Sequence, residues 1–317
     1  MTTILKGCIV SAPALGRLET SEHGYLIAEN GHITGIYPVL PEQYAGAPVE
    51  DYGNDLIVQS FADLHLHAPQ YPMLGMGMDL PLLDWLNAYA FPTEARFADP
   101  DYARAVYRRL ARELIAGGTT RVCMFSSLHR PATVILMEEL ERAGVTGYVG
   151  KVNVDRNALP GVLEATAEES IRETLQWLEE SAAFHHVKPM LTPRFIPSCS
   201  DEVLSFLGKL AAERDLPIQS HLSENQAEME WLRQLHPDCK QYWEAYAKFG
   251  LWNSRTVMAH CVWSDARERQ AMHDAGVTAV HCADSNQNIC SGTAPVRVML
   301  QEGVQVALGS DIAGGDH

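Results

Sequence analysis

The stretch FADLHLH, residues 61–67, marks the point where the pattern of this chain changes. In residues 1–60 apolar and polar residues alternate, as they do along β-strands. After residue 61 short apolar runs alternate with helical stretches. Residues two apart on a strand face the same side of a sheet. We therefore predict a strand at Phe61–His67 that points His65 and His67 in one direction from its C-terminal end.

Seven further strands are predicted after the first, each from a short apolar run. They are Thr119–Phe125, Thr146–Val152, Val187–Thr192, Pro217–His221, Thr256–His260, Val277–His281 and Val304–Gly309. Eight strands that alternate with helices over about 250 residues are typical of the α/β class known as the (β/α)8 or TIM barrel. The alternative is an open doubly wound sheet, but no GxGxxG motif follows any early strand.

The helices between these strands are predicted from apolar residues that recur on one face. The clearest is Asp101–Ala116, which Gly117-Gly118 ends as a C-cap should. The others are Pro131–Ala143, Glu168–Glu180, Asp201–Glu213, Asn225–Leu235 and Asp265–Ala275. The chain stops six residues after Asp311, so no helix follows the eighth strand, and we expect that a C-terminal segment is missing.

Residues 1–60 are predicted to form β structure. The runs Tyr25–Glu29 and His32–Tyr37 flank Asn30-Gly31, which is a strong signal for a two-residue hairpin turn. A third run, Asp55–Val58, leads into the first histidine pair. We therefore expect two domains, an N-terminal β segment at residues 1–60 and a barrel at residues 61–317.

Composition narrows the class of partners. The formal charge of −16 opposes binding to phosphate backbones, so we expect no nucleic-acid partner. No run of 18 apolar residues appears, so we expect no membrane span, and the first residues lack the features of a signal peptide. Seven scattered cysteines without a CxxC pair favour free thiols, and together these features predict a cytoplasmic protein.

Five potential metal ligands lie at or just after the C-terminal ends of predicted strands. Parallel barrel strands bring these ends to one rim, where side chains from different strands meet. Imidazoles together with a carboxylate suit zinc, or iron in the same role. The candidate ligands are His65, His67, His221, His260 and Asp311. His281 also ends a strand, and we interpret it as a supporting or structural histidine.

Glu224 is the candidate acid and base, because it lies three residues after His221, near the predicted metal rim. A desolvated glutamate with a raised pKa can take a proton from water and deliver it to a leaving group. The alternative is that Glu224 simply favours a helix N-terminus. Gln70, Arg194 and Phe195 also follow strands, and they are either contacts to a flat polar ring or ordinary loop residues.

Eight segments across residues 55–315 resemble the amidohydrolase superfamily and, within it, the guanine deaminase family. They are DLHLHAPQY, DLPLLDWLNAYAFPTEARF, GTTRVCMFSSLH, GKVNVDRN, LTPRFIPSCS, QSHLSENQAEMEW, TVMAHCVWS and LGSDIAGG. The HxH and SD motifs occur throughout the superfamily. The WLNAYAFPTE and TPRF segments are more specific, and they select the guanine deaminase family.

The resemblance implies a (β/α)8 barrel with one zinc ion, a small β-sandwich built from N- and C-terminal segments, and a homodimer. It implies His65, His67, His221 and Asp311 as metal ligands, with His260 either binding the metal or hydrogen-bonding its water. Glu224 would shuttle the proton and act as a catalytic residue together with Asp311 and His260. The purine would be held by Gln70, Arg194 and Phe195, with His67, His221, Glu224 and Asp311 also facing it.

The activity that follows from the resemblance is the hydrolysis of guanine to xanthine and ammonia. One alternative is an aminohydrolase for a triazine, pterin or adenosine-like ring, and another is a non-catalytic barrel that acts as an assembly partner. Two departures from the family pattern are the early end of the chain and Cys282-Ala283-Asp284 in place of a cysteine-proline. No lysine ends the fourth strand to bridge two metals, which favours a single ion.

Overall fold

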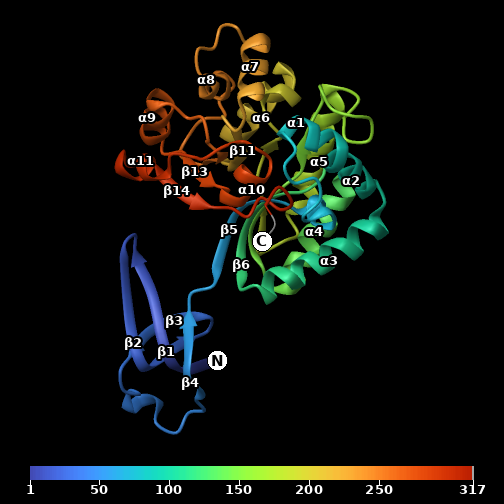
Figure 1. Ribbon diagram of the computed structural model, residues 1–317. Coiled ribbons are helices and arrows are strands. Elements are labelled where there is room, and N and C mark those ends of the chain that lie inside the picture. The colour runs from blue at the N-terminus through green and yellow to red at the C-terminus, as the bar shows by residue number, and fades with distance from the viewer. Residues whose placement is uncertain (316–317) are drawn as a thin grey trace. The chain divides into compact units, whose positions relative to one another are not determined.

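The computed structural model describes residues 1–315, and it contains two compact units, Met1–Phe61 and a second unit that begins at Ala62 (Figure 1). In the first unit one sheet has the strand order β3-β2-β1-β4. Its strands are β1 (Thr2–Ala14), β2 (Arg17–Glu29), β3 (His32–Tyr37) and β4 (Glu50–Val58), with a 3-10 turn at Glu42–Tyr44. This sheet is the N-terminal portion of the expected β-sandwich.

The predicted hairpin is confirmed, because β2 and β3 pair antiparallel on either side of Asn30-Gly31. Both turn residues have positive φ angles, 51° and 82°, as a turn that matches the twist of a hairpin requires. The sequence did not single out β1, which is a central strand and pairs antiparallel with β2 and parallel with β4.

The second unit is the predicted barrel. Its parallel strands form the series β5-β6-β7-β9 and β11-β12-β13-β14, and a two-stranded pair, β8 and β10. Their bounds are β5 (Phe61–His67), β6 (Thr119–Phe125), β7 (Thr146–Gly150), β8 (Val152–Asn153), β9 (Val187–Pro189), β10 (Thr192–Pro193), β11 (Ile218–Leu222), β12 (Thr256–His260), β13 (Thr278–His281) and β14 (Gln305–Leu308). The eight predicted strands are therefore present.

Strands three and four differ from the prediction, because each is interrupted rather than continuous. β7 pairs with β9 and β8 pairs with β10, so the two interruptions lie opposite each other. Pro189 and Pro193 have no backbone N–H and cannot donate to the ladder, which explains why the fourth strand is short on both sides of its break.

Backbone contacts join the two four-stranded series. Leu191 forms a parallel bridge with Ile218 at the start of β11. On the other side, Asp311 N donates to the carbonyl of His65 at 2.8 Å, and His67 N donates to the carbonyl of Ile312 at 2.9 Å. The residues after β14 thus lie against the end of β5, which closes the barrel and brings Asp311 beside the two histidines.

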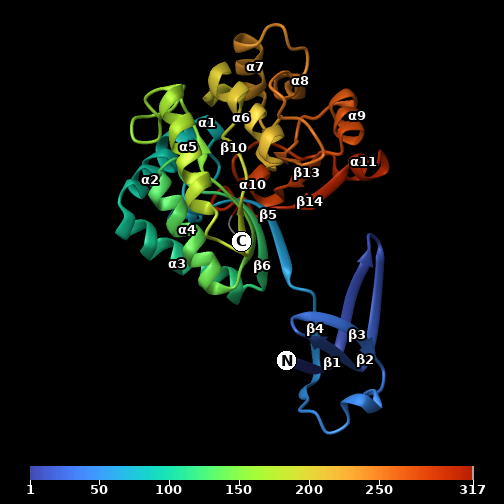
Figure 2. The same ribbon diagram turned by 180° about the vertical axis from the view of Figure 1, so that it is seen from behind.

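Helices surround these strands, with α3, α4 and α5 on one side and α9 and α11 on the other (Figure 2). All six predicted helices are confirmed to within one residue at each end. They are α3 (Pro100–Ala116), α4 (Arg130–Ala143), α5 (Ala167–Ser181), α6 (Asp201–Arg214), α7 (Gln226–Leu235) and α9 (Ala266–Ala275). Among residues 1–315 no helix combines the length and apolar character that crossing a membrane requires.

The sequence did not predict the shorter helices. They are α1 (Leu82–Trp85), α2 (Phe91–Ala95), α8 (Tyr242–Lys248), α10 (Ala283–Asn288) and α11 (Val296–Gln301), with a π turn at Leu86–Ala90 and 3-10 turns at Ala68–Met73, Arg96–Ala98 and Ile196–Ser198. Elements of three to seven residues are too short for a helical period to emerge from the sequence. Several of them nevertheless carry residues of the site described below.

A buried ion pair lies at the interruption of the third strand. Lys151 Nζ is 2.5 Å from Glu164 Oε1 and 3.1 Å from the carbonyl of Val152, and both side chains are buried. Glu164 Oε2 also accepts a hydrogen bond from Val154 N at 3.1 Å. The pair therefore anchors the segment that follows β7.

Replacing Lys151 with methionine is expected to lower the free energy of unfolding by about 3–5 kcal/mol, because it leaves the Glu164 carboxylate buried without a partner. Urea unfolding followed by circular dichroism measures this change. The matched control is Lys209→Met, at an exposed position of α6. A Lys151→Met protein as stable as this control would contradict the assigned role of the ion pair.

Candidate metal centre and active site

Three imidazoles meet at the C-terminal rim of the barrel. His65 and His67 end β5, and His221 lies in β11, all of them buried. Each offers a ring nitrogen, and these nitrogens lie within 4.8 Å of one another, a spacing that a single metal ion can bridge. The Nε2 atoms of His67 and His221 face each other at 3.1 Å.

Asp311 adds a carboxylate to this cluster. Its Oδ1 lies 3.2 Å from His65 Nε2 and 3.6 Å from His67 Nε2, and its Oδ2 accepts a hydrogen bond from Ser285 Oγ at 2.5 Å. Ligands at the usual zinc distances are about 3.3 Å apart in a tetrahedral site. Three of the separations among these four side chains, 3.1, 3.2 and 3.6 Å, are close to this spacing, so the group can surround one divalent ion.

The protonation of the imidazoles also suits a metal. Burial lowers the pKa of His65, His67 and His221 well below the usual value, so the rings are neutral. His221 Nδ1 donates to the carbonyl of Arg194 at 2.5 Å, which leaves the lone pair on its Nε2. His65 Nε2 faces the Asp311 carboxylate at 3.2 Å, but the two atoms do not have hydrogen-bond geometry. These donors fit a divalent cation.

His260 and Glu224 stand next to this cluster. His260 Nε2 lies 3.4 Å from Glu224 Oε2 and 3.8 Å from Asp311 Oδ2. The ring is oriented by Asn286 Oδ1, which lies 2.9 Å from His260 Nδ1. Burial, followed by the nearby charge of Asp311, raises the pKa of Glu224 well above its usual value. Glu224 can therefore hold a proton close to the candidate metal ligands.

The backbone at two of these residues is strained. His260 has a φ of 71° and Asp311 a φ of 50°, in the left-handed region that residues other than glycine seldom adopt. Such strain persists where the surrounding structure holds it, and it is concentrated at functional sites. Other non-glycine residues of the described chain also have positive φ, but the side chains of these two meet Glu224 and the imidazoles.

A second group of potential ligands overlaps the first. Atoms of His65, His260 and Cys282 also lie within 4.8 Å of one another. Burial raises the pKa of the Cys282 thiol well above its usual value, so the thiol stays protonated. Because cysteine binds metals as the thiolate, this group is the poorer candidate.

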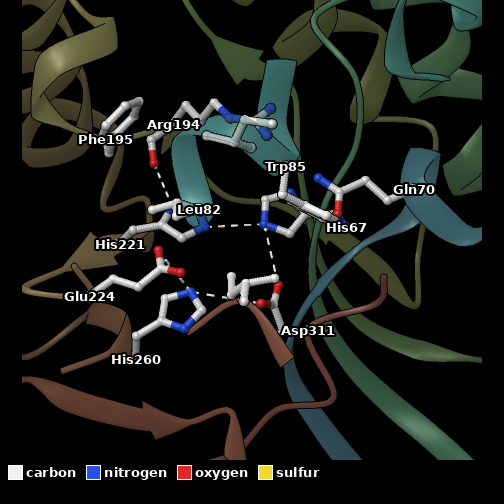
Figure 3. A pocket seen from close by; sticks show the side chains of 12 residues that line it. His67, Gln70, Leu82, Trp85, Arg194, Phe195, His221, Glu224, His260 and Asp311 are labelled. Atoms are coloured by element: carbon white, nitrogen blue, oxygen red, sulfur yellow. Dashed lines mark hydrogen bonds and ion pairs between the residues drawn. The ribbon is translucent and has the colours of Figure 1, made fainter. Parts of the chain in front are cut away.

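A pocket opens over the cluster (Figure 3). It is lined by eight predicted site residues, namely His67, Gln70, Arg194, Phe195, His221, Glu224, His260 and Asp311. His65 is not part of this lining and contacts Asp311 instead. Apolar side chains that the sequence did not single out complete the walls: Leu82, Trp85, Leu86 and Ile289. The half-buried His281 does not line the pocket.

Sequence reasoning also missed Glu94, a buried glutamate in α2. Its carboxylate pairs with Arg194 and accepts a hydrogen bond from Gln70 Nε2. The only available signal was an acidic residue inside FPTEARF, one of the segments that carry the family resemblance. Ser285 and Asn286, which contact Asp311 and His260, lie in α10, another short helix that the sequence did not predict.

Comparisons with known proteins identify the family of this chain. Residues 56–317 match the amidohydrolase family. A guanine deaminase from Dictyostelium discoideum is 40% identical over 271 residues, which are 85% of this chain and 60% of that protein. The chain thus spans less than two thirds of the length of this relative.

Solved structures point to the same family. The crystal structure of a guanine deaminase from C. acetobutylicum with guanine bound in its active site is 42% identical, with a TM-score of 0.97 over 100% of this chain and 76% of that one. A triazine hydrolase from Arthobacter aurescens has a TM-score of 0.89 over 99% of this chain and 72% of that one, but at 17% identity it shows only a shared fold. This chain belongs to the amidohydrolase family and, within that family, to the guanine deaminases.

Proposed function

We propose that the protein hydrolyses guanine to xanthine and ammonia with one zinc ion bound at the barrel rim. The observation that carries this proposal is the convergence of three neutral imidazoles and Asp311 under a pocket that also contains a buried, protonatable Glu224. The similarity to a guanine deaminase crystallised with guanine supports the choice of substrate.

The residues that would hold the ion are His65, His67, His221 and Asp311. Iron suits the same set of nitrogen and oxygen ligands, so zinc is the first choice and iron the second. His260 would either complete the ligand set or, through Nε2, hydrogen-bond the attacking water. A divalent cation bound there acidifies water, and this is the chemistry that hydrolysis at neutral pH needs.

Glu224 would move the proton. As the water oxygen forms a bond to C2 of guanine, Glu224 and Asp311 take up the proton that the water releases. Glu224 then gives this proton to the ring nitrogen. A second proton, from the new hydroxyl on C2, passes through Glu224 to the amine as that oxygen becomes a carbonyl, the C2–N bond breaks, and ammonia leaves. The raised pKa of Glu224 supports this role, because burial makes its carboxylate a stronger base than usual toward water while its acid form can still give the proton to the ring and the amine.

The pocket would hold the flat base between its apolar walls. Phe195, which follows β10, and Trp85 of α1 offer aromatic surface. Leu82 and Ile289 add aliphatic surface. Arg194 and Gln70 would donate hydrogen bonds to the polar edge of the ring as charge develops. His67, His221, Glu224 and Asp311 would face the end of the base that carries the amino group.

An ammonia-release assay across a panel of rings tests the substrate. Guanine is expected to exceed a triazine, a pterin and adenosine by about 10²-fold or more in kcat/KM, because a pocket that hydrogen-bonds one ring leaves polar groups unpaired with another. A higher value for another ring would replace guanine as the substrate. A protein that binds metal yet releases no ammonia from any ring would favour the non-catalytic alternative.

We also propose a cytoplasmic homodimer. The seven cysteines form no disulfide in the structure, which suits a reducing compartment. The homodimer is the state that the family resemblance implies. Light scattering on the purified protein tests it, since a dimer has twice the mass of the chain and a monomer would remove this part of the proposal.

A further inference from the structure

We infer that Glu94 is a positioning residue that fixes how Arg194 and Gln70 present their hydrogen-bond donors, and that it thereby makes the pocket select rings with an acceptor on the edge remote from the metal ligands. The inference rests on the proposed guanine deamination and adds a determinant of specificity to it. It starts from three contacts of one buried carboxylate.

Glu94 is saturated by two partners from other parts of the barrel. Its Oε2 lies 2.7 Å from Arg194 Nη1, and its Oε1 lies 3.1 Å from Arg194 Nη2 and 2.8 Å from Gln70 Nε2. The side chains of Glu94 and Arg194 are only 4% and 5% exposed. A two-point pair between a guanidinium and a carboxylate fixes the plane of both groups.

The same carboxylate sets the orientation of the Gln70 amide. An ionised carboxylate only accepts hydrogen bonds, so Gln70 must turn its amide nitrogen toward Glu94. Its Oε1 then accepts from Ala313 N at 3.1 Å, two residues after Asp311. With one lone pair of the carbonyl used by the backbone and one N–H directed at Glu94, Gln70 keeps its second N–H as a donor for a ligand.

Arg194 is held in a similar way. Two of its five N–H groups are directed at Glu94, and the others remain as donors. Its guanidinium also lies 5.1 Å from the centre of the Phe91 ring, which belongs to α2 together with Glu94. Residues three apart on a helix share a face, so one turn of α2 supplies both supports of Arg194.

These constraints give the pocket an edge at which N–H donors are fixed in place. Arg194 and Gln70 line the pocket together with the candidate metal ligands (Figure 3). The Glu94 charge balances the Arg194 charge, so this edge suits a neutral ring. Guanine carries acceptors at O6 and N7, away from the amino group on C2. A ring without the oxygen would leave buried donors unpaired, which is costly.

A binding comparison isolates this role from catalysis. Hypoxanthine carries an oxygen at C6 and a hydrogen on N1, purine carries neither, and neither ring has the amino group that would be hydrolysed. Their Kd values are measured by calorimetry on the zinc-loaded protein and on Glu94→Gln, together with zinc content and guanine kcat/KM. The matched control is Glu139→Gln, another buried glutamate, which pairs with Arg104, Arg108 and Arg142 away from the pocket.

The unsubstituted protein and Glu139→Gln are expected to prefer hypoxanthine over purine by about 10-fold or more, the scale of one satisfied hydrogen bond to a charged donor. In Glu94→Gln this preference is expected to fall to near one, with guanine kcat/KM about 10²-fold lower and zinc content unchanged. An unchanged preference, even with lower kcat/KM, would mean that Glu94 is only structural and would overturn the inference.

The experiment also covers two other results, a variant that does not fold and an unsubstituted protein that does not turn over guanine. If Glu94→Gln does not fold, Glu94→Asp decides, because it keeps the charge but is too short to reach both partners. A reduced preference in that variant supports the inference, and an unchanged one overturns it. If the unsubstituted protein does not turn over guanine, the proposed function fails, whereas the ratio of the two Kd values still tests Glu94.

Discussion

Replacing Glu224 with glutamine is expected to lower kcat for guanine by about 10³- to 10⁴-fold, the upper range for loss of a general acid and base. Glutamine keeps the shape of the side chain but cannot take a proton from water or return one to the leaving amine. The pKa of Glu224 is raised by burial, and its Oε2 lies 3.4 Å from His260 Nε2, so the proton that it carries is close to the candidate metal ligands. The measurement is steady-state turnover of guanine.

The zinc content of Glu224→Gln is expected to stay at one ion per chain, because the three imidazoles and Asp311 are untouched. The matched control is Glu230→Gln in α7, at an exposed glutamate six residues along the chain. This control is expected to retain the full rate. A Glu224→Gln protein with near-normal turnover would remove Glu224 from the mechanism.

Removing the metal is expected to abolish turnover and to destabilise the protein. Chelation leaves buried imidazole lone pairs and the Asp311 carboxylate facing one another without a cation between them. A ligand present at about a thousand times its Kd contributes about 4 kcal/mol to stability, so the midpoint of thermal unfolding should fall on chelation. Activity and the midpoint should both return when zinc is added.

Replacing one of the candidate ligands also tests whether the reaction needs the metal, and it does so without a chelator. His67→Ala removes a ring whose Nε2 lies 3.1 Å from His221 Nε2, and it is expected to abolish both zinc binding and activity. His273→Ala, at an exposed position of α9, is the control and should keep both. A chelated protein or a His67→Ala protein that still turns over guanine would exclude a metal from the reaction.

The parts of the fold that could be predicted are those whose pattern is long or strongly local. The helix at Pro100–Ala116 repeats its apolar residues over four turns, and the strand that ends at His260 follows an apolar run. The hairpin at Asn30-Gly31 depends only on two turn residues. Each of these signals is contained within one stretch of sequence, so the tertiary structure is not needed to detect it.

The remaining features depend on contacts between distant residues. The break in the third strand is matched by the break in the fourth, which no single segment reveals. Glu94 lies in a helix of five residues, and its importance becomes visible only where Arg194 and Gln70 meet it. Similarly, Asn286 is an ordinary polar residue until the fold brings its side chain to His260.

In the site, too, some features could be predicted from the sequence and others depend on contacts between distant residues. The strand-end positions of His65, His67, His221 and Asp311 could be found in the sequence because parallel strands bring their C-terminal ends together. The distances between their donor atoms could not, since they follow from the backbone bonds that hold Asp311 and Ile312 against β5. Strained φ angles at His260 and Asp311 are likewise a property of the assembled barrel.

The most direct test of the central claim is a crystal structure of the purified protein with anomalous data collected on both sides of the zinc absorption edge. We predict one anomalous peak per chain, in contact with His65, His67, His221 and Asp311. A chain with full guanine turnover and no peak among these four side chains, or with its metal bound elsewhere, would contradict the account.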